Sequence, residues 1–297
     1  MQVPAYGNTK PVPFAAAIMQ STALESTMAF NISFNATAAI AVSANCNATD
    51  SFSTSPAMID CLRSLPMETL LNLTLDFINP TLANNDRDIF LPTVDQDFLP
   101  DLASSLVAEG KLPKIPFMAG WQEDDATLFT NSVIETNADT RAFFEVYYPD
   151  LNSTTLTNLL NLYPVDKFTA NITANKSAEL YRAAHIFRDI LLTCPSAYFG
   201  SSMAKKYANV FDPTPSDYDL AKWYPGSWSA FAHWSMPSVE GKRTLEARSS
   251  AFPNGEGEGE VYVVGGGKPG MRGPGLERLD ESCGFLNSEV VIEQLKY

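Results

Sequence analysis

Three consecutive acidic residues, Glu123, Asp124 and Asp125, follow a short apolar run, PFMAG, and the chain has two histidines, His185 and His233. A carboxylate that hydrogen-bonds one imidazole nitrogen fixes the tautomer, so that the other nitrogen can act as a general base. One of these acids paired with one histidine could therefore serve acyl transfer. For each acid the alternative is a solvated turn at the end of a strand.

The two histidines lie in different surroundings. His185 lies inside YRAAHIFRD, a helical pattern, and we interpret it as a core or helix-face residue. His233 lies in the aromatic segment SWSAFAHWSMPS, which we expect to be a loop between two strands. Because functional side chains gather at the carboxyl ends of parallel strands, His233 is the better candidate for a base.

No nucleophile motif accompanies this pair. The strand-to-helix motif G-x-S-x-G is absent, and neither GSSMA (200–204) nor GSWSA (226–230) has its second glycine. H-E-x-x-H, C-x-x-C and G-x-x-x-x-G-K-[ST] are also absent, and GGGKPG (265–270) is interpreted as a flexible loop. We therefore expect neither a metal nor a cofactor.

Composition excludes several function classes. The chain has 297 residues, of which 45% are apolar and 18% charged, which is typical of a globular protein. Its formal net charge of −14 disfavours binding to nucleic acid. No apolar run reaches the length of a transmembrane helix, and the first residues do not form a signal peptide.

Glycosylation sequons and cysteines nevertheless indicate a secreted protein. Four cysteines are compatible with two disulfides in an oxidising compartment. A cytosolic Asn/Thr-rich chain with chance sequons is the alternative. The N-x-S/T sequons, each a candidate surface site, begin at Asn31, Asn35, Asn47, Asn72, Asn152, Asn171 and Asn175.

The order of elements predicts an α/β fold with a mostly parallel sheet flanked by helices. We expect 76–100 to be irregular, 213–226 to be a loop, and the long helical segment 177–207 to be broken at Pro195. Strands are predicted at 14–20, 114–121, 208–212 and 261–264, and helices within 24–53 and at 55–73, 101–110, 134–148, 151–162 and 288–295.

Several ordered blocks resemble the type B carboxylesterase/lipase/cholinesterase family of α/β-hydrolases, and its fungal members most of all. AAAIMQSTA resembles the family's A-I-x-Q-S-G strand, and CLRSLP resembles its C-L-R step. KIPFMAGWQEDDATLF resembles the block that ends in (D/N)-E-G-x-x-F, and HIFRDILLTCP and ERLDESCGFLNS resemble the two segments that carry the C-terminal disulfide.

The resemblance implies roles for six residues. Asp125 takes the position of the acid in a Ser–Glu/Asp–His triad, where the family more often has Glu, and His233 takes that of the base. Glu123 and Asp124 keep the interpretation of a solvated turn. The implied disulfides are Cys46–Cys61 and Cys194–Cys283. Residues 1–297 would then be the C-terminal portion of a single carboxylesterase domain that acts on small-molecule or lipid esters; the oligomeric state is left open.

The family's serine and Gly-rich oxyanion loop precede the A-I-x-Q-S-G strand, which lies near the start of this chain. The resemblance thus implies an N-terminally truncated ester hydrolase that lacks the nucleophile elbow, and we expect the chain alone to be inactive. The open edge of the first strand makes it an aggregation risk. A non-catalytic cholinesterase-like protein or the degenerate product of a decaying gene is the alternative.

Overall fold

The computed structural model describes residues 3–24, 30–46, 55–83, 90, 92–203, 205–212, 220–245, 260–265, 270–273 and 279–297. These residues form a five-stranded sheet in the order β1-β2-β3-β4-β5. Adjacent strands from β1 to β4 are parallel, and β5 runs antiparallel to β4. The strands are β1 (Ala17–Gln20), β2 (Pro116–Gln122), β3 (Lys205–Asp212), β4 (Val261–Gly265) and β5 (Gly270–Arg272).

The sheet confirms the predicted α/β class. Each of the four predicted strands is present, and β3 is longer than expected because it begins at Lys205. Strand β1 lies at one edge of the described sheet, and Ile18 on it is 39% exposed. Since an exposed apolar edge strand can pair with another chain, the aggregation risk stays a prediction for β1.

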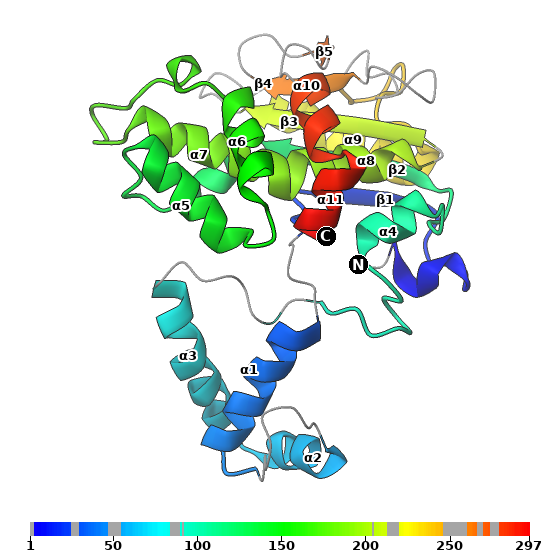
Figure 1. The fold of residues 1–297 in the computed structure, drawn as a ribbon. Helices are drawn as coiled ribbons and strands as arrows, with labels where there is room; N and C mark the ends of the chain where they lie inside the picture. Colours follow the sequence, from blue (N-terminus) through cyan, green and yellow to red (C-terminus); the bar gives the residue numbers. More distant parts are fainter. Residues whose placement is uncertain are drawn as a thin grey trace.

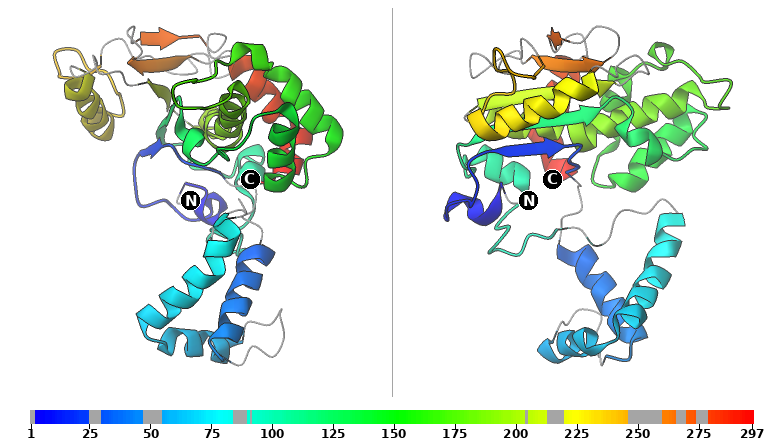
Figure 2. Two further views of the ribbon diagram at one scale, coloured as in Figure 1. Left: turned by 90° about the vertical axis from the view of Figure 1, so that its left-hand side faces the viewer. Right: turned by 180° about the vertical axis from the view of Figure 1, so that it is seen from behind.

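Helices cover both faces of the sheet. Figures 1 and 2 show α8 (Cys194–Ser201), α10 (Leu279–Leu286) and α11 (Glu289–Leu295) on one face and α9 (Leu220–Trp234) on the other. The short helix α4 (Ala103–Ala108) ends as expected, because Gly110 has a φ of +68° that favours glycine. The remaining helices of this part are α5 (Asn137–Tyr147), α6 (Ser153–Leu162) and α7 (Ala178–Arg188).

Helices α1 (Phe30–Ser43), α2 (Pro56–Ser64) and α3 (Met67–Ala83) form a separate group below the sheet in Figure 1. Their apolar cluster includes Ile40, Met58 and Leu62, and the Cys46–Cys61 disulfide ties the chain across it. This bond closes a loop with a sequence separation of 15 residues. By chain entropy it contributes about 3 kcal/mol. Helix α3 extends to Ala83, so the prediction that 76–100 is irregular is wrong at its start.

The segment that follows α7 departs from the expected break at Pro195. A π-helical turn, Asp189–Thr193, joins α7 to α8, and Pro195 lies in the first turn of α8. Thr193 and Cys194 have right-handed helical dihedrals, so the chain stays helical as it enters Pro195. The second disulfide, Cys194–Cys283, fixes α8 to α10, so both bonds have the pairing that the resemblance implies.

Exposed asparagines occupy most of the described sequon positions. Asn152 also caps α6, since its side-chain oxygen accepts hydrogen bonds from the backbone N–H groups of Thr154 and Thr155. The side chain of Asn31 and the whole of Asn47 lie outside the described residues. The exposed sequon asparagines are Asn35, Asn72, Asn152, Asn171 and Asn175.

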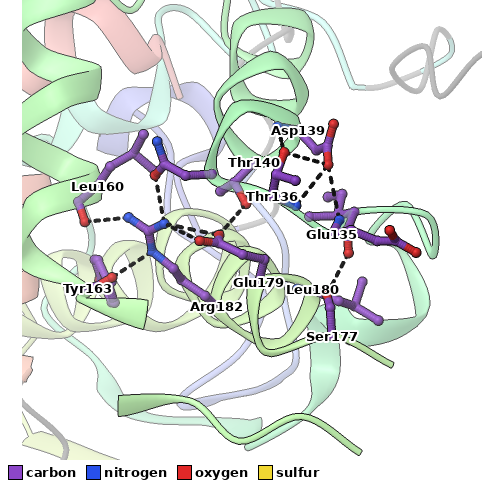
Figure 3. Close-up of polar contacts among 12 residues, drawn as sticks. Glu135, Thr136, Asp139, Thr140, Leu160, Tyr163, Ser177, Glu179, Leu180 and Arg182 are labelled. Atoms are coloured by element: carbon purple, nitrogen blue, oxygen red, sulfur yellow. Dashed lines mark hydrogen bonds and ion pairs between the residues drawn. The ribbon is translucent and has the colours of Figure 1, made fainter. Parts of the chain in front are cut away.

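A buried ion pair holds α5, α6 and α7 together (Figure 3). Arg182 Nη1 lies 3.0 Å from Glu179 Oε2, and both side chains are less than a tenth exposed. The guanidinium also donates to the backbone oxygens of Tyr163 and Leu160, near the end of α6. Thr140 of α5 donates to the same Glu179 carboxylate, so the charges are paired and hydrogen-bonded as burial requires.

Replacing Arg182 by Met should strongly destabilise the fold. The change leaves the Glu179 carboxylate buried without its counter-charge, and we expect the free energy of unfolding to fall by about 3–5 kcal/mol. Chemical denaturation measures the difference. Arg141→Met is the matched control, because Arg141 on α5 makes a surface ion pair with Glu145 and should cost less than about 1 kcal/mol. Equal losses in the two variants would contradict this account of the pair.

Among the described residues, no helix is long and apolar enough to cross a membrane.

Candidate active site

Asp125 lies where the carboxyl ends of β1 and β2 meet. Strand β2 ends at Gln122, and a 3-10 turn, η2 (Asp125–Leu128), begins three residues later. The Asp125 Oδ2 atom accepts two hydrogen bonds of 2.7 Å, one from the Ser21 hydroxyl and one from the Gln122 backbone N–H. This is the edge at which parallel α/β sheets place their functional groups, and Asp125 is half-buried there.

Ser21 joins the candidate site through its hydrogen bond to Asp125, a role that its sequence pattern does not predict. It follows β1 directly, has a φ of 45°, and continues the ladder by donating its backbone N–H to Gly120. A left-handed conformation is uncommon for serine. It occurs here where the Ser21 side chain is directed at the Asp125 carboxylate. The sequence feature that could indicate Ser21 is the Gln-Ser pair at the end of β1, the strand that pairs with β2 just before Asp125.

Glu123 is not the solvated turn residue that the sequence analysis expected. Its carboxylate lies 2.9 Å from Nη1 of Arg188, a side chain that is 1% exposed, and its backbone oxygen accepts a hydrogen bond from the same nitrogen. The prediction failed because Arg188 is distant in sequence and reaches the turn from the end of α7. Asp124 is exposed, as expected.

Arg188 lies within a cluster of charged and polar side chains below the turn. Its Nε and Nη2 atoms donate to Asp189 Oδ1 at 3.0 and 2.8 Å. Asp189 is fully buried, and the Tyr163 hydroxyl donates to its other carboxylate oxygen. Nη2 also lies 2.9 Å from His185 Nε2, so that nitrogen acts as an acceptor and His185 is neutral. Burial, and next the charge of Arg188, lower the pKa of His185.

The lowered pKa of His185 predicts a dependence of stability on pH. Below about pH 6.5 the unfolded chain takes up a proton at His185 before the folded chain does. Stability is therefore lost as the pH falls below that value. In His185→Gln we expect a flatter slope of unfolding free energy against pH, by at most about 1.4 kcal/mol per pH unit. Denaturation curves recorded between pH 5 and 8 measure this slope. If the slope is the same in His185→Gln as in the unchanged protein, the lowered pKa of His185 is wrong.

His233 is not in a loop, which corrects the sequence prediction. It lies in the last turn of α9, is exposed, and makes an edge-on contact with the ring of Trp234 at 4.5 Å between centroids. Helix α9 also replaces the end of the loop expected at 213–226; residues 213–219 lie outside the described part. Over the described residues, no hydrogen bond or ion pair joins His233 to Asp125.

Packing explains why α9 forms despite Pro225 and Gly226. Ser227, Ala230 and Phe231 are at most 1% exposed and lie on one face of the helix. The Ser227 hydroxyl accepts a hydrogen bond from the Leu245 backbone N–H. Gly226 is required at this contact, because a Cβ there would overlap the Arg243 carbonyl oxygen.

Within the described ranges, no group of three or more His, Cys, Asp or Glu side chains could hold a metal ion.

Comparison with known proteins identifies the family. The model of the carboxylesterase family matches residues 8–243, which include Ser21, Asp125 and His233. The chain belongs to the carboxylesterase family.

Two fungal proteins are similar in sequence to this chain. A secreted lipase of Arthroderma benhamiae is 34% identical over an alignment that covers 100% of this chain and 61% of the relative. The inactive carboxylesterase-like protein VdtD of Byssochlamys spectabilis is 35% identical over 63% of this chain and 33% of that protein. This carboxylesterase-family chain thus spans less than two thirds of the length of these relatives.

The fold of this carboxylesterase-family chain agrees with that of a solved relative. The crystal structure of Aspergillus niger EstA superposes with a TM-score of 0.74 at 16% identity, over 100% of this chain and 62% of that one. The chain therefore has part of an α/β-hydrolase fold. In the described residues this part includes the β1 and β2 ends, where Ser21 and Asp125 meet.

Proposed function

We propose that this chain supplies the acid and the base of a serine-type carboxylic ester hydrolase. Asp125 is the acid, and His233 is the base. The chain would be the C-terminal portion of a single carboxylesterase domain, and a segment outside residues 1–297 would supply the serine and the oxyanion loop. This fits the absence of G-x-S-x-G from the sequence and the larger length of the relatives.

In the proposed reaction, the serine hydroxyl attacks the ester carbonyl carbon while His233 takes its proton. His233 then gives that proton to the departing alcohol, which leaves an acyl-serine. Water attacks the acyl-serine, with His233 again as the base, and the carboxylic acid and free serine are formed. Asp125 holds the imidazole in the correct tautomer and stabilises its charged form throughout.

The observation that carries the proposal is the position of Asp125. Ser21 and the Gln122 N–H hold one carboxylate oxygen, Oδ2, and no hydrogen bond in the described part of the chain uses the other oxygen, Oδ1. A carboxylate has capacity for further donors, so Oδ1 can accept a hydrogen bond from an imidazole. In the described structure His233 lies in the last turn of α9 and is not bonded to Asp125. The proposal therefore requires His233 to leave the end of α9, and the segment around it to rearrange in the complete polypeptide.

We further propose that the natural protein is extracellular and glycosylated. Two disulfides tie the chain, the similar protein of Arthroderma benhamiae is named a secreted lipase, and the described sequons are exposed. Such bonds persist in oxidising compartments. The substrate would be a small-molecule or lipid ester.

A second candidate is a non-catalytic carboxylesterase-like protein. It is favoured by the similarity to VdtD, which is named inactive, and by the position of His233 on α9 rather than beside Asp125. In this case the fold and the Arg188 cluster would persist without turnover.

The experiment uses the natural polypeptide that carries residues 1–297, isolated from its source. We expect it to hydrolyse p-nitrophenyl butyrate and to be labelled covalently by a fluorophosphonate, which reacts with an activated serine. Residues 1–297 expressed alone should do neither. A natural polypeptide that is folded but shows no hydrolysis and no labelling would support the non-catalytic candidate.

A further inference from the structure

The turn that contains Asp125 is held by the hydrogen bonds of Asp125 and, in addition, by a second contact to the rest of the molecule. That contact is made by Glu123, two residues earlier, which is joined to Arg188 by its carboxylate at 2.9 Å and by its backbone oxygen at 3.2 Å. Helix α7 packs directly on the turn η2. One guanidinium group therefore contacts both the side chain and the backbone of the segment that leads into Asp125.

Arg188 is itself fixed from several directions. A guanidinium has five N–H groups. Two contacts go to Asp189, two to Glu123 and one to the ring of His185. Because the Arg188 and Asp189 side chains are 1% and 0% exposed, the pair cannot move without exposing or separating buried charges.

The buried partner is fixed in turn. Asp189 begins the π-helical turn, and its second oxygen accepts a hydrogen bond from Tyr163 at 2.8 Å. Five residues further along the chain, Cys194 is bonded to Cys283. The guanidinium that contacts Glu123 thus belongs to a rigid part of the molecule, whereas Glu123 lies on the half-exposed turn.

We propose that Arg188 is a positioning residue that holds the Asp125 turn through Glu123. It does not touch the reacting atoms. It fixes the direction of the segment from Gln122 to Asp125, so that the Asp125 carboxylate stays where an imidazole must meet it. The catalytic part of this inference rests on the proposed function, but the structural part does not.

The test compares Glu123→Ala with Asp124→Ala in the natural polypeptide that carries residues 1–297. Both variants remove one carboxylate from the same turn, and the carboxylate of Glu123 is the one that lies 2.9 Å from Arg188 Nη1. Hydrogen exchange of the peptide around 121–129 should become about 10- to 100-fold faster in Glu123→Ala, as expected for loss of a charged hydrogen bond. It should stay unchanged in Asp124→Ala. Equal exchange in the two variants, or a loss of protection that extends to α5 and α6, would overturn the proposal.

Ester hydrolysis provides the readout that a purely structural role would not change. Glu123→Ala should lower kcat roughly 10- to 100-fold, as for a misplaced catalytic group, with KM unchanged. Asp124→Ala should keep both constants. If Asp125→Asn leaves hydrolysis intact, the proposed function fails while the exchange experiment still decides the role of Arg188. If Asp125→Asn abolishes hydrolysis but Glu123→Ala keeps full kcat, the positioning role fails alone.

Discussion

Replacing Asp125 by Asn should lower the kcat of the natural polypeptide about 10³- to 10⁴-fold. Asparagine keeps the size of the side chain and can still accept the hydrogen bonds that Ser21 and Gln122 now donate to Oδ2. It carries no charge to stabilise a protonated imidazole, and its amide group favours the wrong tautomer of the histidine. KM should change little, because the acid does not contact the ester.

Steady-state hydrolysis of p-nitrophenyl butyrate measures this effect. Asp124→Asn serves as the control, because it makes the same change on an exposed neighbour. If the two variants hydrolyse the ester at similar rates, Asp125 is not the acid. A folded natural polypeptide whose hydrolysis does not respond to Asp125→Asn would use different chemistry from the one proposed.

His233→Asn should have at least as large an effect, about 10⁴-fold or more on kcat, because no base would remain to take the serine proton. Triad members act as a unit. The double variant Asp125→Asn/His233→Asn should therefore be about as slow as His233→Asn alone.

His185→Asn provides the matched control for His233→Asn, since His185 lies below the turn and accepts a hydrogen bond from Arg188. Because this variant alters one of several contacts of Arg188, it should lower kcat far less than His233→Asn does. Losses that multiply in the double variant would show that Asp125 and His233 act independently, which contradicts a shared mechanism.

The strands and most helices could be predicted from the sequence because their signals are local. The apolar runs at 114–121 and 261–264 and the Gly110 cap depend on nearby residues alone. Helix α9 could not be predicted in this way. Pro225 and Gly226 favour a loop locally, but Ser227 and Phe231 are buried, and the Ser227 hydroxyl accepts a hydrogen bond from Leu245, 18 residues along the chain.

The same contrast between local signals and long-range contacts holds for the candidate site. Motif resemblance points to Asp125 as the proposed acid, because this residue follows a strand that is recognisable by its own sequence. The role of Glu123 depends on Arg188, and that of Ser21 on Asp125, across 65 and 104 positions of the chain. Such pairs leave no periodic pattern, and only the fold brings them together.

The most direct test of the central claim is a crystal structure of the natural polypeptide after reaction with a fluorophosphonate. Our account predicts a phosphonylated serine, His233 beside it, and an imidazole nitrogen of His233 within about 2.6–3.2 Å of an Asp125 carboxylate oxygen. If His233 instead remains at the exposed end of α9 without contact to Asp125, the proposed acid–base pair is wrong.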